Sequence, residues 1–134
     1  LLMCNFGERE RLTAGGLRFD PAEGPPPPEG SCIAVCATDA PMTAQQLRRL
    51  ALRPLLGLAR AGSYAHDGSG EIGIAFTTAR EQTLGNEQLN PFFAAAYEAA
   101  EEAVYNCLVA ERPPMRKRDG REHPEFPRNL LARP

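Results

Sequence analysis

The chain has 134 residues, of which 43% are hydrophobic and 24% charged, and its formal net charge is -2. This length and composition fit one globular domain, and the weak negative charge argues against a general nucleic-acid-binding protein. No apolar run reaches the roughly 18 residues of a membrane span, and the start lacks the basic-then-apolar pattern of a signal peptide. Because the sequence opens inside an apolar run, Leu1-Leu2-Met3, we expect a fragment of a longer polypeptide.

The first part of the chain predicts two strands, a linker and then a buried strand. Residues 1–6 read as a strand, residues 12–13 as a weak strand and residues 15–30 as a linker. The proline block 25–28 should be extended, because repeated proline favours the polyproline conformation. Residues 31–38 are apolar or small on both faces, so we expect a central strand that is covered on each side.

Next, residues 71–78 predict a strand whose two faces differ in size. One face carries Ile72, Ile74 and Phe76, and we expect this bulky face to pack on helices. The other face carries small residues and one carboxylate, at Glu71, Gly73, Ala75 and Thr77. We expect the small face to leave room for another sheet or a ligand.

A helix is expected between these two strands. Thr43 and Gln46 have the spacing of a capping box, and the apolar residues that follow have helical spacing up to a stop at Gly62. Pro54 should kink this helix, because proline has no amide hydrogen to donate.

A second helix should run from Pro91 to about Glu111. Asn90 before Pro91 is a typical helix start, and we place Tyr97 and Tyr105 in the core. Strands that alternate with helices point to an α/β layered domain.

The cysteines do not organise the predicted fold. Cys32 and Cys36 are four residues apart in a strand, about 13 Å, whereas disulfide-linked Cα atoms lie within about 7 Å. The pair should therefore neither bridge nor share a metal, and Cys4 and Cys107 have no obvious partners. Four reduced thiols favour a cytoplasmic protein. Neither histidine has ligand-type spacing, so no metal is expected.

The last 23 residues are strongly basic. Residues 112–134 carry seven Arg or Lys against three acidic residues. They are either a solvated basic tail or a surface that docks on an acidic partner chain.

Gly30-Ser31 is the candidate for chemistry. A small residue here precedes a hydroxyl at the first position of a buried strand, directly after the proline linker. If this peptide bond were cut, Ser31 would carry a free α-amine with a pKa of about 7.7–8.0, so that a useful fraction is unprotonated near neutrality. The amine could then be the base for its own hydroxyl, as in N-terminal nucleophile hydrolases. From spacing alone, a Gly-Ser pair after prolines is more often the end of a linker.

Residues 30–41 (GSCIAVCATDAP) resemble the self-processing segment of the DmpA-like aminopeptidases, a family of L-aminopeptidase/D-esterases and β-peptidyl aminopeptidases. Further stretches resemble the family in the same order, namely residues 1–12 around Asn5-Phe6-Gly7, 46–51, 56–60, 68–72, 99–103 and 118–120. The resemblance implies an α/β fold, the α-β-β-α layered sandwich of this N-terminal nucleophile type, here incomplete. Residues 1–30 would be the end of the N-terminal (alpha) segment with its linker, and residues 31–134 the nucleophile-bearing C-terminal (beta) segment.

The resemblance also implies roles for individual residues. Ser31 would attack the Gly30 carbonyl in self-cleavage and later the amide carbonyl of a substrate. Asn5 would stabilise the negative charge that develops on oxygen. Ser69 would orient hydrogen bonds to Ser31, and Glu71 would pair with an ammonium, either that of Ser31 or that of the substrate. Taken singly, Asn5 could be a turn residue, Ser69 a loop hydroxyl and Glu71 a solvated charge. We expect Tyr64 and His66, which precede Ser69, to be packing or rim residues.

The implied function is a serine-type N-terminal nucleophile hydrolase that releases N-terminal residues from peptides, amides or esters. The resemblance implies no cofactor and no metal, a homo-oligomer, and neither nucleic acid nor membrane as a partner. The alternatives are an inactive remnant that acts as a structural or interaction module, and an acyltransferase that uses the same acyl-enzyme.

The chain departs from the family in three ways. It lacks most of the long N-terminal segment, which holds a further active-site tyrosine and most of the first sheet. Its linker is richer in proline, and Pro54 interrupts a helix that is unbroken in relatives.

Overall fold

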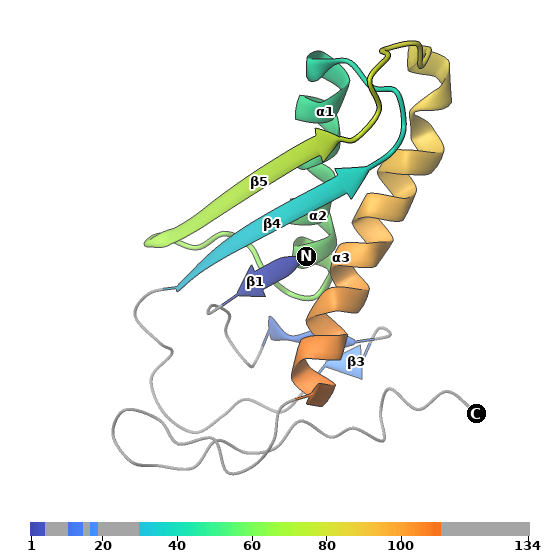
Figure 1. The fold of residues 1–134 in the computed structure, drawn as a ribbon. Helices are drawn as coiled ribbons and strands as arrows, with labels where there is room; N and C mark the ends of the chain where they lie inside the picture. The colour runs from blue at the N-terminus through green and yellow to red at the C-terminus, as the bar shows by residue number, and fades with distance from the viewer. Residues whose placement is uncertain (5–10, 15–16, 19–29, 111–134) are drawn as a thin grey trace, which may run out of the picture.

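The computed structural model describes residues 1–4, 11–14, 17–18 and 30–110 (Figure 1). Its main sheet has three strands in the order β1-β4-β5, formed by Leu2–Cys4, Gly30–Thr38 and Ser69–Thr77. The long strand β4 is central, as predicted, and runs antiparallel to β1 and parallel to β5. Parallel neighbours need a crossover connection, and the helices between residues 44 and 60 supply it.

A small hairpin lies beside this sheet. It consists of β2 (Thr13–Ala14) and β3 (Leu17–Arg18), so the second of its strands falls where we predicted a linker, and that part of the prediction is wrong. A two-residue strand is too short to leave a period in the sequence. Thr13 holds the hairpin in place, because its N–H donates to the Ala61 carbonyl over 3.1 Å. The proline block and the basic tail lie outside the described residues.

The predicted helix after β4 is two helices, α1 (Ala44–Ala51) and α2 (Arg53–Arg60). The capping box of α1 is confirmed, because the Gln46 N–H donates to Thr43 Oγ1 and the Thr43 N–H donates to Gln46 Oε1 over 2.8 Å. Pro54 lies in the first turn of α2, where a missing amide hydrogen costs no helical hydrogen bond. Where we predicted one helix with a kink, the structure thus has two separate helices.

Gly62 ends α2, as predicted. Its φ of +113° is in the left-handed region that favours glycine. A Cβ at this position would also lie only 2.1 Å from the Arg11 carbonyl oxygen, so the chain can pass here only without a side chain.

The long helix α3 spans Asn90–Ala110, with Phe93, Ala96 and Ala100 buried. It approaches α2 closely at Gly57, where a Cβ would lie 2.3 Å from the Tyr97 carbonyl oxygen. Tyr97 and Tyr105 are both half-buried, and Tyr105 packs against the buried Ala14 in a second, smaller core cluster. The Tyr105 hydroxyl donates to Glu101 Oε1 of the same helix over 2.6 Å.

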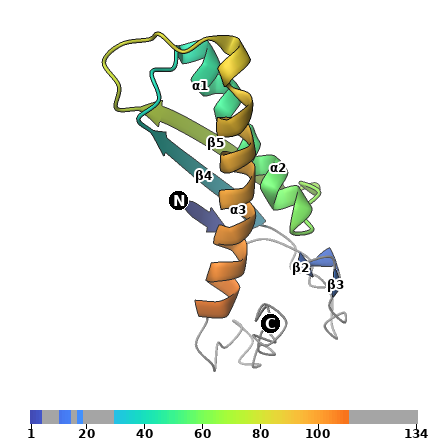
Figure 2. The same cartoon turned by 90° about the vertical axis from the view of Figure 1, so that its right-hand side faces the viewer.

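Helices α1, α2 and α3 lie on one side of the sheet (Figures 1 and 2). The main core lies between the helices and one end of the sheet, and its buried members are Ala40, Met42, Leu50, Leu89, Phe93 and Ala96. Cys36 of β4 and Ala75 of β5 pack against this core, so the helix-covered face of the sheet is its small-residue face.

This arrangement is the reverse of the one predicted for β5. Ile72, Ile74 and Phe76 are 53%, 47% and 46% exposed on the face that the helices leave open. Helix α1 instead packs on Gly73, where a Cβ would lie only 2.2 Å from the Ala51 carbonyl oxygen. Close approach of a helix backbone thus decided the packing. Among the residues that the structure describes, β4 is covered by helices on one face only.

Among the helices that the structure describes, none is both long enough and apolar enough to cross a lipid bilayer.

Candidate functional site

The predicted cleavage position lies at the beginning of β4. Gly30 is buried and Ser31 is exposed. In the parallel ladder, Gly30 is opposite Ser69, Ser31 is opposite Gly70 and Cys32 is opposite Glu71. The two segments that carry predicted site residues, about forty residues apart in sequence, therefore start side by side at one end of the sheet (Figure 1).

A tight turn positions the start of β5. Gly68 has a φ of +86°, which a side chain would disfavour, and the Ser69 N–H donates to the His66 carbonyl over 2.9 Å. The loop before this turn carries Tyr64, which is 52% exposed and whose ring centroid lies 5.8 Å from that of His66. The guanidinium of Arg11 lies 4.3 Å from the centroid of the Tyr64 ring. Contacts among these side chains support packing roles for Tyr64 and His66.

Ser69 and Glu71 form a hydrogen-bonded pair. The Ser69 hydroxyl donates to Glu71 Oε1 over 2.5 Å, a short distance that is typical of a hydroxyl donating to a carboxylate. Both residues are half-buried on the helix-facing side of β5, together with Cys32 of β4. Burial is the main cause that raises the pKa of the Cys32 thiol, and the charge of Glu71 raises this pKa further.

Ser31 has the opposite orientation. Side chains alternate along a strand, and Ser31 lies with Gly70 on the open face of the sheet. A Cβ at Gly70 would lie 3.5 Å from Ser31 Oγ. The uncut chain thus brings the backbones of Ser31, Ser69 and Glu71 together, but it holds the hydroxyl of Ser31 on the opposite face from the Ser69–Glu71 pair.

Asn5, the predicted oxyanion-hole residue, lies outside the described residues. Its neighbour in sequence, Cys4, ends β1 and is directly opposite Cys32, the residue after Ser31.

Two thiols that sequence reasoning left unpaired meet at this position. Cys4 Sγ lies 3.6 Å from Cys32 Sγ. Burial is the main cause that raises the pKa of Cys4 strongly, and the contact with Cys32 raises it further. The strand pattern of residues 1–6 could suggest that Cys4 lies in the sheet, but it holds no information on which residue of another strand is opposite. Within the described ranges, no group of three or more His, Cys, Asp and Glu side chains is placed to hold a metal ion.

Solved structures share this architecture. The PH0078 protein from Pyrococcus horikoshii matches with a TM-score of 0.75 and 35% identity, over 97% of this chain and 40% of that one. The L-aminopeptidase D-Ala-esterase/amidase from Ochrobactrum anthropi, described as a new variant of the N-terminal nucleophile hydrolase fold, matches with a TM-score of 0.66 and 31% identity, over 83% of this chain and 35% of that one. The fold is that of an N-terminal nucleophile hydrolase, and the described residues form part of its α/β sandwich.

The family follows from the sequence comparisons. The model of peptidase family S58 matches residues 1–123. The β-peptidyl aminopeptidase BapA from Sphingosinicella microcystinivorans is 37% identical over 141 residues, covering 82% of this chain and 36% of the relative. The chain therefore belongs to peptidase family S58, and the predicted DmpA-like family is confirmed. It spans 35% to 40% of the length of the relatives named here.

Proposed function

We propose that this chain is the nucleophile-bearing part of a serine-type aminopeptidase that cleaves itself between Gly30 and Ser31. The observation that carries the proposal is the register of β4 and β5, in which Gly30 is opposite Ser69 and Cys32 is opposite Glu71. This register supports a single site built from the starts of two neighbouring strands. The substrates would be short peptides, amino-acid amides or esters with a free amino end.

Self-cleavage would begin with the Ser31 hydroxyl. Its oxygen attacks the Gly30 carbonyl carbon, the C–N bond to Ser31 breaks, and the hydroxyl proton passes to the Ser31 nitrogen, so that the acyl group moves from nitrogen to oxygen. Water then hydrolyses the resulting ester and leaves a carboxylate on Gly30 and a free amine and hydroxyl on Ser31. The amine, with a pKa of about 7.7–8.0, is then a base for the hydroxyl of the same residue.

The Ser69–Glu71 pair supports a place for an ammonium. A serine hydroxyl has one hydrogen to donate and two lone pairs to accept with, and Glu71 receives that hydrogen in the uncut chain. The Ser69 oxygen and the second carboxylate oxygen of Glu71 could therefore accept hydrogen bonds from an ammonium. That ammonium is either the new end of Ser31 or the amino end of the substrate, and the second case gives aminopeptidase specificity.

The orientation of Ser31 has to change after the cut. As long as Gly30 precedes it, Ser31 is held in the strand with its hydroxyl on the open face. Once that bond is broken, rotation about the Cα–C bond of Ser31 can bring either its amine or its side chain to the helix-covered side of the sheet. Either group can then reach the Ser69–Glu71 pair. Asn5 would stabilise the oxyanion, an effect typically worth about 10² to 10³ in rate.

Intact mass and N-terminal sequencing test the self-cleavage. We expect the purified chain to separate into a piece that ends at Gly30 and a piece that begins at Ser31, and the Ser31→Ala variant to stay whole. Equal cleavage in Ser31→Ala would overturn the proposal, because an outside protease would then be the cause.

Hydrolysis of an amino-acid p-nitroanilide tests the peptidase step. Ser31→Ala should lose this activity, and Glu71→Gln should raise KM for substrates with a free amine more than it lowers kcat. An unchanged KM in Glu71→Gln would contradict the role of Glu71 in pairing with the substrate ammonium.

A second candidate function is an inactive module that takes part in an interaction. The observation that favours it is the open face of β5, where Ile72 and Ile74 are each about half exposed. A chain that stays whole and inactive in both wild-type and Ser31→Ala forms would support this function instead.

A further inference from the structure

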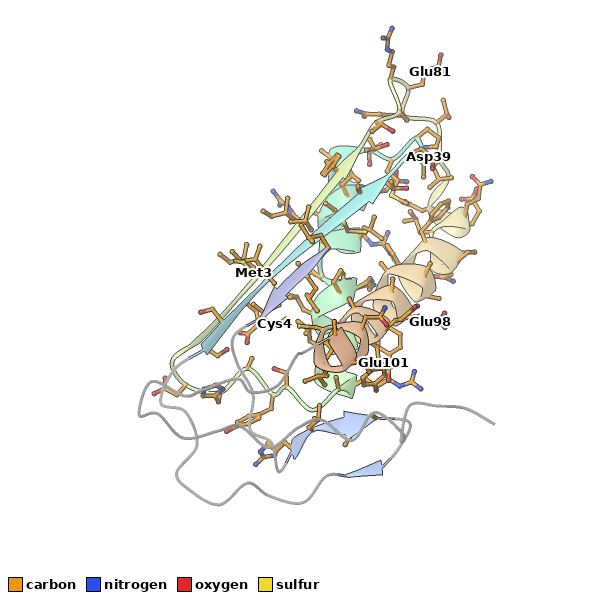
Figure 3. The ribbon with its side chains drawn as sticks, turned by 60° about the horizontal axis from the view of Figure 1, so that its bottom comes forward. Met3, Cys4, Asp39, Glu81, Glu98 and Glu101 are labelled. Carbon is orange, nitrogen blue, oxygen red and sulfur yellow. The ribbon has the colours of Figure 1, made fainter. Side chains whose placement is uncertain are left out.

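The contact between Cys4 and Cys32 joins the two segments on either side of the proposed cleavage position. Cys4 is in β1 and Cys32 in β4, 28 positions later. They are directly opposite in an antiparallel pair, and Figure 3 shows Met3 and Cys4 on opposite sides of β1, with Cys4 toward the helices. Both thiols thus lie on the helix-covered side of the sheet, and Cys32 directly follows Ser31 in β4.

The backbone at this position already has the spacing that a disulfide needs. Directly opposite residues of antiparallel strands have Cα atoms about 4.5–5.5 Å apart, and disulfides occur at Cα separations of about 4.4–6.8 Å. The two sulfur atoms are in hydrogen-bond contact at 3.6 Å. A bond between them therefore needs changes in side-chain rotamers and little movement of the strands.

The other two cysteines do not share this geometry. Cys36 is in the same strand as Cys32 and packs against the core at the other end of the sheet. Cys107 is exposed on α3, and its charge adds to the raised pKa of Cys4, so it is the competing partner that an experiment must separate. The hydrogen bond of Cys4 nevertheless goes to Cys32.

We propose that Cys4 and Cys32 are a dithiol site that forms a reversible cross-strand disulfide with a disulfide-bearing oxidant such as oxidised glutathione. The half-buried Cys4 is the entry point, because Cys32 is fully buried. The Cys4 thiolate attacks one sulfur of oxidised glutathione, and one glutathione thiolate leaves. The Cys32 thiolate then attacks the Cys4 sulfur of this mixed disulfide, and the second glutathione leaves. Two protons are released, and the oxidant takes both electrons.

The disulfide would fasten β1 to the strand that carries Ser31. This holds whether or not the chain is cut. If the cut of the proposed function also occurs, Cys4 and Cys32 end up in different pieces, and the bond would be a covalent link between them. Oxidation would then keep the amino-terminal piece, with Asn5, attached to the piece that carries the nucleophile.

Peptide mapping of the oxidised chain tests the proposal. The full chain is incubated with oxidised glutathione at mildly alkaline pH, because burial raises the pKa of both thiols and leaves little thiolate at neutrality. Remaining thiols are then blocked with N-ethylmaleimide. Trypsin cleaves after Arg9, Arg18 and Arg48, so Cys4 falls in one peptide and Cys32 with Cys36 in another. We expect these two peptides to be linked, and the link to disappear on reduction.

Variants locate the bond. The link should persist in Cys36→Ser and in Cys107→Ser, and it should be lost in Cys4→Ser. Fragmentation of the linked peptide from the unaltered chain, which needs no variant to fold, should place the bond on Cys32. Three outcomes would each overturn the proposal. The first is that N-ethylmaleimide still reacts with Cys4 and Cys32 after oxidation, and the second is a stable glutathione adduct on Cys4. The third is a bond from Cys4 to Cys36 or to Cys107.

The same sample separates this proposal from the proposed function. The bond between the Cys4 peptide and the Cys32 peptide can form with or without cleavage at Gly30–Ser31. Its presence in a whole chain therefore supports the disulfide alone. If the chain is cut, the two pieces should run as one band on a gel without reductant and as two bands with it. Two bands without reductant would contradict the disulfide and leave the self-cleavage supported.

Discussion

The two faces of the main sheet differ in both residue size and burial. The helix-covered face carries small residues, namely Cys32, Ala34, Cys36, Gly73 and Ala75, whereas the open face carries Ile33, Val35, Ile72, Ile74 and Phe76. Large hydrophobic residues are usually the more buried ones, but here the three large residues of β5 are about half exposed. Backbone approach of α1, and not side-chain size, therefore decides which face the helices cover.

The family fold explains the large residues of the open face. In an α-β-β-α sandwich, each sheet has helices on one side and the other sheet on its second side. Packed sheets are about 10 Å apart and fill the space between them with large side chains. The open face has the composition of such an inner layer, and the chain spans 36% of its relative from Sphingosinicella microcystinivorans. The open face therefore has the composition expected of a side that packs on a second sheet, and the small face has that of a side that packs on helices.

The largest expected effect is on the helix-covered face, at Gly73. In Gly73→Ala, the new methyl group would lie 2.2 Å from the Ala51 carbonyl oxygen, and α1 would have to move away from β5. We expect the free energy of unfolding to fall by about 3 kcal/mol, because forcing atoms into a packed layer costs about this much. Urea unfolding followed by circular dichroism measures the loss. A change near zero would mean that α1 is not held against β5 at this position.

Local patterns predicted most of the elements. Thr43 and Gln46 indicated the start of α1, and Gly62 indicated the end of α2, because caps depend on residues that are near in sequence. Pro54 indicated an interruption, but we predicted a kink in one helix where the structure has two helices. Alternation in β5 correctly separated its residues into two faces. It did not show which face helices cover, because that depends on the distance between α1 and Gly73, and no local pattern contains this distance.

The sequence predicted which residues belong to the candidate site, but not how they are arranged in space. The family resemblance named Ser31, Ser69 and Glu71, but the register that makes them neighbours is a long-range property of the sheet. The opposite orientation of Ser31 and Glu71 follows only once that register is known. The pairing of Cys4 with Cys32 was missed for the same reason, since strand pairing across 28 positions leaves no local mark.

The second-largest effect is expected at a buried polar contact between α1 and the segment that precedes α3. Gln46 is 5% exposed, and its Nε2 donates to the Leu84 carbonyl over 2.8 Å and to Asn86 Oδ1 over 3.1 Å. Gln46→Ala would leave buried polar atoms without partners, and we expect a loss of about 2 kcal/mol in the free energy of unfolding.

Gln88 is the matched control for Gln46. Its Oε1 accepts from the Gly85 N–H over 2.9 Å, but in an exposed position. Water can replace that contact, so Gln88→Ala should cost less than about 0.5 kcal/mol. Equal losses in the two variants would mean that burial does not set the cost of removing the hydrogen bonds of a glutamine side chain.

A smaller effect is expected on the open face, at Ile74. In Ile74→Thr a β-branched residue is kept in the strand, and the side chain is already 47% exposed. We expect the free energy of unfolding of this chain to change by less than about 0.5 kcal/mol, as measured by the same urea titration. A loss comparable to that of Gly73→Ala would show that the open face is covered in solution, for example by a second copy of the chain.

The change in stability expected at Gly70 should have the opposite sign to that at Gly73. A Cβ at Gly70 would lie 3.5 Å from Ser31 Oγ, an ordinary contact distance. Replacing a strand glycine by alanine without strain restricts the unfolded chain, so Gly70→Ala should stabilise by about 0.5 kcal/mol. The same methyl group would contact Ser31 Oγ and restrict its movement, which should slow self-cleavage if the hydroxyl reacts from the open face. A stabilised variant that still separates into two pieces at the wild-type rate would show that the Ser31 hydroxyl does not react from the open face, and that the nucleophile turns toward Ser69 and Glu71 before the first bond is broken.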